Sequence, residues 1–214
     1  MIPAYDSSYL VHAKRILGWM LDAAVNLFGQ SAERFWQKFL ESGYADRFGS
    51  GEPRLLCGMT GYELAKEILT ASNQAFADIP PTAVTDLSPE YWAGWALAQY
   101  QWRTSLTFIE IDAFAPISSV IASYHPYHEM DITHFFDFMD ARYRAANPVS
   151  RLKRRRILCG LSQSDLSRIS GIPVRMIQHY EQRAKNLGSA AFETVYKLSQ
   201  ALHCPPLLIT EPVN

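Results

Sequence analysis

A short stretch near the C-terminus, GLSQSDLSRISGIPVRMIQHYEQ (residues 160–182), constrains the fold most, because one Gly separates two segments with helical spacing. Two helices that cross closely need a small residue in the first helix and a residue that accepts positive φ in the turn. Ser167 and Gly171 occupy these two places. The spacing therefore predicts a helix-turn-helix, and the apolar residues expected to hold its crossing are Leu166, Ile169, Ile172, Ile177 and Tyr180.

The segments on either side of this stretch agree with that prediction. Residues 151–160 (RLKRRRILCG) predict a basic helix, and residues 190–209 predict a fourth helix and a short fifth. Ser162 is placed to cap the first helix of the motif. Residues 151–210 resemble the phage-repressor/Cro-type (XRE) helix-turn-helix family. The resemblance implies a five-helix domain whose recognition helix enters the major groove of DNA.

The resemblance also assigns roles to single residues. Arg156 and Glu181 match an internal ion pair that braces the first helix against the recognition helix, so both are expected to be structural. Arg175 matches a base-facing position, where it can donate two hydrogen bonds to guanine. The other expected base contacts are Val174 and His179, and the expected phosphate contacts are Ser162, Gln163 and Gln182. Arg183 and Lys185 follow the recognition helix and are expected to reach the DNA backbone.

Two residues depart from the family pattern. Pro173 stands where Ser or Thr usually caps the recognition helix, so one phosphate contact is missing its hydroxyl. Arg183 replaces a frequent Gly, and the following loop is expected to differ. The basic residues of the first helix either form a solvated face or touch DNA; they are Lys153, Arg154 and Arg155.

The charge distribution separates the chain into two parts. Residues 1–148 contain 10 Lys or Arg and 17 Asp or Glu, whereas residues 149–214 contain 10 Lys or Arg and 4 Asp or Glu. An acidic body followed by a basic segment indicates an anionic partner for that segment. We therefore expect an acidic helical domain over residues 1–148, a linker Asn147–Ser150 in which Pro148 disfavours helix, and a DNA-binding domain over residues 151–210.

The acidic part also predicts helices, so the fold class is all-α. Apolar residues recur at helical spacing over residues 7–29, and Ser31, Thr60 with Glu63, Ser88 and Asp131 provide start signals for later helices. Shorter helices are expected near residues 106–114 and 117–124. Pro80 and Pro81 predict a loop over residues 73–89.

Composition favours a cytoplasmic protein. The first 20 residues lack the basic and apolar regions of a signal peptide, and no run of about 18 apolar residues occurs. The three Cys are far apart and form no CxxC motif, so no disulfide framework is expected.

Four residues with 3-4-3 spacing (Trp92, Trp95, Gln99 and Trp102) lie on one face of a predicted helix. This face is expected to pack in the core. The alternative is a dimer or partner surface, since Trp and Tyr are common interface anchors.

The segment YHPYHEMDITHFFDFMD (residues 124–140) holds the chain's densest group of potential metal ligands, including His125, His128, Glu129 and His134. Its spacing matches no zinc pattern, His125 precedes a Pro in an expected loop, and Asp131 is better used as a helix cap. We therefore expect no metal, no cofactor and no catalytic site here, and the protein is not expected to be an enzyme.

The sequence therefore predicts a sequence-specific transcriptional regulator, most simply a repressor that binds its operator as a homodimer. It also resembles bacterial antitoxins, in which a second domain neutralises a toxin while the helix-turn-helix provides autoregulation. The first alternative is thus a protein-interaction module whose acidic domain holds a toxin. The second is a metal-dependent enzyme fused to a DNA-binding domain.

Overall fold

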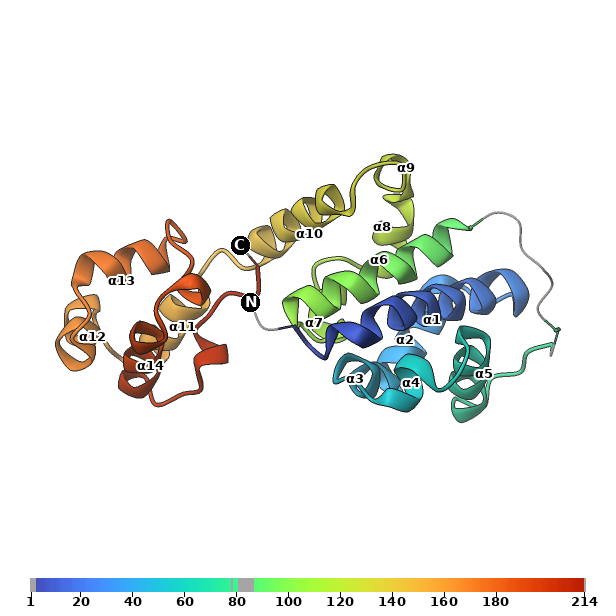
Figure 1. Cartoon of the computed structure of the whole chain (residues 1–214), viewed down its shortest axis with the longest axis horizontal. Coiled ribbons are helices and arrows are strands. Elements are labelled where there is room, and N and C mark those ends of the chain that lie inside the picture. The colour runs from blue at the N-terminus through green and yellow to red at the C-terminus, as the bar shows by residue number, and fades with distance from the viewer. Residues whose placement is uncertain (1–2, 78, 81–86, 214) are drawn as a thin grey trace. The chain divides into compact units, whose positions relative to one another are not determined.

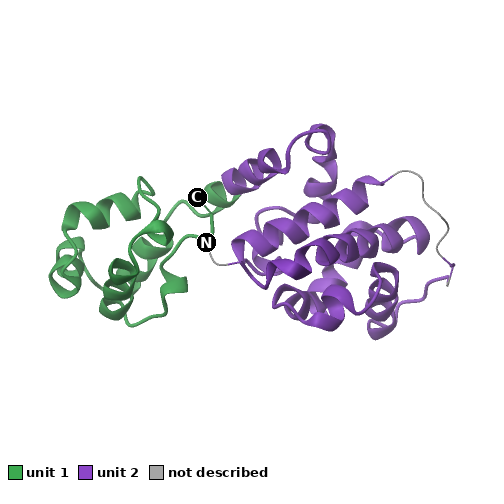
Figure 2. Cartoon of the chain, in the orientation of Figure 1, with its two compact units in different colours: residues 1, 143–214 green, residues 2–142 purple. Residues whose placement is uncertain are grey.

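The computed structural model describes residues 3–77, 79–80 and 87–213. The described residues form helices and no strand, which confirms the all-α prediction. The chain divides into two compact units, shown in Figure 2. Unit 1 comprises Tyr143–Asn214 with residue 1, and unit 2 comprises Ile2–Arg142.

Unit 2 is built from short and medium helices (Figure 1). In chain order they are η1 (Ser7–Tyr9), α1 (Leu10–Asp22), the π-helix η2 (Ala23–Leu27), α2 (Ala32–Glu41), α3 (Tyr44–Gly49), α4 (Pro53–Cys57), α5 (Gly61–Ala71), α6 (Pro89–Thr104), α7 (Phe108–Asp112), α8 (Ile117–Ala122), α9 (Tyr124–Tyr127) and α10 (Ile132–Ala146). The last turn of α10 belongs to unit 1.

The α1 and α6 helices form the central pair of unit 2 and lie side by side in Figure 1. A Cβ atom built on Gly94 of α6 would lie 2.4 Å from the carbonyl oxygen of Leu17 in α1. A Cβ on Gly18 of α1 would lie 2.9 Å from the Tyr91 backbone oxygen. Glycine at both positions therefore lets the two backbones touch, and α6 is buried over most of its surface.

Aromatic rings fill a second part of the core of unit 2. The Phe108 ring of α7 meets three others at centroid distances of 5.4–6.0 Å, those of Trp36, Phe39 and Phe48. A buried carboxylate joins α10 to α6: Asp140 accepts hydrogen bonds from Tyr100 Oη (3.0 Å) and from both terminal nitrogens of Arg103 (3.2 Å each). This charge is buried but paired, as a low-dielectric site requires.

Most of the predicted start signals act as expected. Ser31 and Ser88 cap α2 and α6, and Thr60 and Glu63 form a reciprocal capping box at α5. No helix covers residues 73–77, 79–80 and 87–88 of the predicted loop 73–89, α6 begins at its last residue, Pro89, and residues 78 and 81–86 lie outside the described residues. The short helices α3, of six residues, and α4, of five residues, were not predicted.

The aromatic face of α6 is used largely within unit 2. Trp92 is buried against Tyr124 and Phe135, and Trp102 Nε1 donates a hydrogen bond to the Tyr5 carbonyl oxygen at 2.8 Å. Trp95 is half-buried, with the Lys14 ammonium 4.5 Å from its ring centroid. These contacts support core packing for this face.

Unit 1 contains α11 (Arg151–Leu158), α12 (Gln163–Ser170), α13 (Val174–Glu181), η3 (Leu187–Ser189), α14 (Phe192–Ala201) and η4 (Pro206–Leu208). The expected short fifth helix is thus a single 3-10 turn, with Pro205 and Pro206 at its start, where a missing amide hydrogen costs no helical hydrogen bond. Among the described helices of the chain, none combines the length and apolar character needed to cross a bilayer.

Candidate nucleic-acid interface

The turn between α12 and α13 has the geometry that the sequence predicts. Gly171 ends α12 with φ of +70°, a conformation that glycine adopts without steric cost. Its amide donates to the Ser167 carbonyl oxygen at 2.8 Å. The chain then enters α13 through Pro173. The two helices are thus joined by a three-residue turn, as in a helix-turn-helix.

A small apolar core holds α13 against the rest of unit 1. Leu166, Ile177 and Tyr180 are buried together with residues of α11, α14 and the loops between them. Ile172 packs partly against this core. The prediction for Ile169 is wrong, because its side chain is 50% exposed. The inner face of α12 is formed instead by Leu166 and Ser170, four residues apart, which turns Ile169 away.

A buried ion pair connects α11 to the end of α13. Arg156 Nε lies 2.6 Å from Glu181 Oε1, and Arg156 Nη2 lies 3.0 Å from Oε2. The hydrogen bonds with Glu181 raise the pKa of Arg156. A third donor, Arg156 Nη1, reaches the Leu161 carbonyl oxygen at 2.7 Å. Because the pair is bidentate and almost fully buried, it fixes the direction of α13 relative to α11.

Gln163 extends this network toward the surface. Its Nε2 donates to Glu181 Oε2 at 2.8 Å, and its Oε1 accepts from Gln178 Nε2 at 3.3 Å. Gln163, expected at a phosphate, is therefore held at the junction of α12 and α13. Gln178 was not anticipated in the sequence analysis. Its place one turn after Val174 and Arg175 was the signal that would have identified it.

The outer face of α13 carries the residues expected at DNA bases. Arg175, Gln178 and Gln182 are exposed, and Val174 and His179 are half-buried. The Arg175 side chain has no hydrogen bond or ion pair with any described residue, so its five donors are available. No side chain caps the start of α13, where Pro173 provides no hydroxyl.

Two residues expected at phosphates have other partners. Ser162 Oγ accepts from the Asp165 amide at 3.0 Å and donates to Asp165 Oδ2 at 2.6 Å, forming a capping box. A carboxylate thus occupies the start of α12, where it would repel a phosphate. Arg183 Nη2 donates to the Asn147 carbonyl oxygen at 2.8 Å and lies 3.4 Å from Glu211 Oε1. Arg183 has φ of +55°, which explains why glycine suits this position.

The remaining basic residues differ in whether their side chains already donate hydrogen bonds within unit 1. Arg155 donates to the carbonyl oxygens of Leu202 and His203, and Arg154 reaches Asn147 Oδ1 at 3.3 Å. Lys153 is exposed, and Lys185 is exposed with only a 4.0 Å contact to Met176 Sδ. Lys153 and Lys185 are therefore the free cations closest in sequence to the motif.

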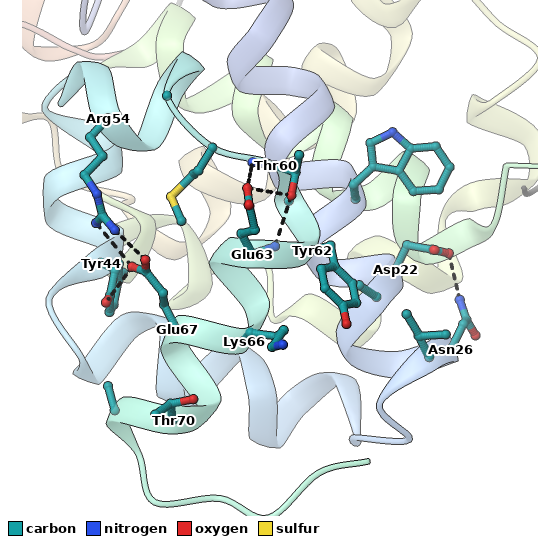
Figure 3. Close-up of a pocket in the computed structure, with 17 residues that line it drawn as sticks. Asp22, Asn26, Tyr44, Arg54, Thr60, Tyr62, Glu63, Lys66, Glu67 and Thr70 are labelled. Atoms are coloured by element: carbon teal, nitrogen blue, oxygen red, sulfur yellow. Dashed lines mark hydrogen bonds and ion pairs between the residues drawn. The ribbon is translucent and has the colours of Figure 1, made fainter. Parts of the chain in front are cut away.

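Unit 2 contains a separate pocket of about 1300 Å³, lined by residues of α1, η2, α3, α4 and α5 (Figure 3). On one wall Glu67 accepts hydrogen bonds from Arg54 and, at 3.1 Å, from Tyr44 Oη. On another, Asp22 accepts from Asn26 Nδ2 at 2.9 Å. The pocket therefore has polar groups that are already paired, set among apolar side chains such as Leu27 and Met59.

Comparison with known proteins identifies one part of the chain. Residues 152–209 match the family model described as Helix-turn-helix. No curated protein and no solved structure matches the chain. The match covers α11 to η4, including the turn at Gly171 and the Arg156–Glu181 pair. The C-terminal region is therefore a DNA-binding helix-turn-helix domain of the phage-repressor/Cro (XRE) family.

Proposed function

We propose that this protein is a transcriptional repressor that binds an operator upstream of its own gene, with α13 in the major groove. The observation that carries this proposal is the exposed and unpartnered Arg175 at the start of α13, on a helix whose direction is fixed by the Arg156–Glu181 pair. A rigid helix with a free guanidinium is suited to bidentate recognition of guanine.

In this proposal the residues of unit 1 have different tasks. Arg175, Val174, Gln178 and His179 read bases, and Gln182, Lys153 and Lys185 contact phosphates. Gln163 positions Gln178 and contacts the backbone at the edge of the groove. Ser162 and Arg183 are left out of the interface, because the Asp165 capping box and the Asn147–Glu211 contacts already engage them.

The proposal is tested by binding of the purified protein to its own upstream DNA over a salt series. Arg175→Ala should weaken binding by about 1–3 kcal/mol, roughly 5- to 150-fold, and relax preference at one base pair. Wild-type affinity should fall steeply with salt, because phosphate contacts release counterions.

Arg168→Ala is the matched control, since it removes the same charge from an exposed residue of α12 that pairs with Asp165. This variant should keep the sequence preference of the wild type. Equal losses in the Arg175 and Arg168 variants would show that charge alone determines binding. Absence of specific binding at low salt would contradict the repressor proposal.

We also propose that the active form is a homodimer. Phe192 and Tyr196 of α14 stack with a centroid distance of 5.8 Å, although they are 77% and 48% exposed. Exposed aromatic side chains that pack on each other are suited to a self-complementary contact. Sedimentation of the protein with and without operator DNA measures the oligomeric state.

A second candidate function is partner binding by unit 2, as in an antitoxin, and the pocket in Figure 3 favours it. Its volume of about 1300 Å³ exceeds the roughly 300–1000 Å³ of sites for small molecules. A segment of another protein fits such a space better than a metabolite. The π-helix η2 lines the pocket, and such bulges are frequent at functional sites.

The partner proposal is tested by co-expression with the product of the neighbouring gene and by size-exclusion chromatography. Thr70 is exposed and lines the pocket, so Thr70→Trp should obstruct it without disturbing the core. This variant should lose the complex, whereas Arg175→Ala and the control Gln37→Trp on α2 should keep it. A complex that tolerates Thr70→Trp would place the contact elsewhere.

A further inference from the structure

Three potential metal ligands converge in unit 2, around the short helix α9. One ligand atom from each of His125, His128 and Glu129 lies within 4.8 Å of the other two. No metal was expected here, because the ligand spacing matches no zinc pattern, His125 precedes a Pro and Asp131 suits a helix cap. In the structure His125 has extended backbone angles (φ −89°, ψ 127°), and its ring lies 4.5 Å from that of His128.

The tautomer of His128 follows from its contacts. His128 Nδ1 lies 2.9 Å from the Tyr124 carbonyl oxygen. A carbonyl oxygen can only accept, so Nδ1 carries the hydrogen, and in the neutral ring Nε2 is left with its lone pair. A ligating His is commonly oriented in this way, by donating its second ring nitrogen to a backbone carbonyl.

Glu129 faces this free lone pair. Its Oε1 lies 3.4 Å from His128 Nε2. Two acceptor atoms at this distance repel each other unless a cation lies between them, either a proton on Nε2 or a metal ion. Two ligands about 2.0–2.1 Å from a tetrahedral zinc ion are separated by about 3.4 Å, so the observed separation already fits a metal.

The site stands on a rigid support. The Tyr124 ring stacks on His128 with a centroid distance of 3.8 Å and an interplanar angle of 15°. Tyr124 in turn packs edge-on against Trp92, which is buried in α6. The imidazole is therefore held in place by the core of unit 2, and little side-chain entropy is lost when a ligand binds.

We propose that His125, His128 and Glu129 form a binding site for a divalent transition-metal ion of the zinc class, with a fourth position open to water. Two imidazole nitrogens and one carboxylate oxygen are a donor set that zinc accepts. Asp131, from the same segment, is not part of the site, because its Oδ1 accepts from the amide and hydroxyl of Thr133. This site is independent of the proposed DNA-binding function.

The test is titration of the chelator-treated full-length protein with zinc chloride in an isothermal titration calorimeter. Metal analysis of the dialysed protein then gives the number of zinc ions bound per chain. We expect one zinc ion per chain. Glu129→Gln changes a side chain that is 71% exposed, so it should fold normally, and it should weaken binding at least about 10-fold. His128→Ala should abolish the site.

His134→Ala is the matched control, because His134 is an exposed His of the same segment outside the cluster. It should bind zinc like the wild type. Absence of zinc binding by the wild type would overturn the proposal. Wild-type affinity in the Glu129→Gln and His128→Ala variants would overturn it equally, since the zinc would then lie elsewhere.

Discussion

Unit 1 joins its helices through a small, mainly aliphatic core and one buried ion pair, whereas the core of unit 2 contains many aromatic rings. In the small unit, directional contacts between Arg156 and Glu181 set the helix angle. In the larger unit, the volume of the packed side chains and the close approach of the α1 and α6 backbones set the helix angle. A domain that must present one helix to DNA thus depends on a few defined contacts, while a larger domain can distribute the same task over its whole core.

The largest effect is expected from Arg156→Ala. It leaves the Glu181 carboxylate buried without its ion-pair partner, which costs about 3–5 kcal/mol. All five Trp lie before residue 143, so Trp fluorescence reports on unit 2 alone. Urea unfolding of the variant should show early loss of helix by circular dichroism and an unchanged fluorescence transition. Coincident shifts of both signals would mean that the units unfold together.

A smaller effect, confined to unit 2, is expected from Gly94→Val. The new side chain would overlap the Leu17 carbonyl group, and overpacking of this kind costs about 1–3 kcal/mol. The Trp fluorescence midpoint should move to lower urea while DNA binding persists. Gln37→Val, at an exposed position of α2, is the control and should leave the midpoint near that of the wild type. An unshifted midpoint for Gly94→Val would show that α1 and α6 can move apart at little cost.

The smallest effect concerns the capping box of α12. The hydrogen bond from Ser162 and the contact with Arg168 lower the pKa of Asp165 in the folded state. The ionised carboxylate therefore stabilises unit 1 above its unfolded pKa of about 3.9, and this contribution disappears as the pH falls through the folded value. Asp165→Asn should lower the Tm of unit 1 slightly at pH 7. The difference in Tm should shrink as the pH falls below about 3.9, and a constant difference would contradict this origin.

Much of unit 1 could be predicted because its determinants are local. Gly171 provides the positive φ of the turn, and the spacing of Leu166, Ile177 and Tyr180 places them in the core. Ile169 was assigned wrongly, because an apolar residue in a two-turn helix can point either way, and only the packing of neighbouring helices decides. Arg183 could not be placed from the motif, since its partners Asn147 and Glu211 lie outside it.

In unit 2 the longer helices could be predicted, whereas the short α3 and α4 and the assembly of the helices could not. The caps at Ser31, Thr60 and Ser88 are readable from a few adjacent residues. The pocket, by contrast, is formed where several elements between Trp19 and Ala71 pack together, and no local pattern encodes that packing. The convergence of His125 with His128 depends on backbone angles at one residue, which the pattern of ligand types does not encode.

The contacts of Glu211 determine where the DNA-binding domain can be cut for transfer to another protein. Its carboxylate accepts from the Arg151 amide at 2.7 Å and from Tyr143 Oη at 3.4 Å, so it ties together residues on both sides of the family match at 152–209. A fragment limited to residues 152–209 would lose these hydrogen bonds of Glu211 and the buried side chain of Val213. A transferable DNA-binding domain should therefore include every residue from the last turn of α10 to Val213. A fusion partner is better attached outside those ends.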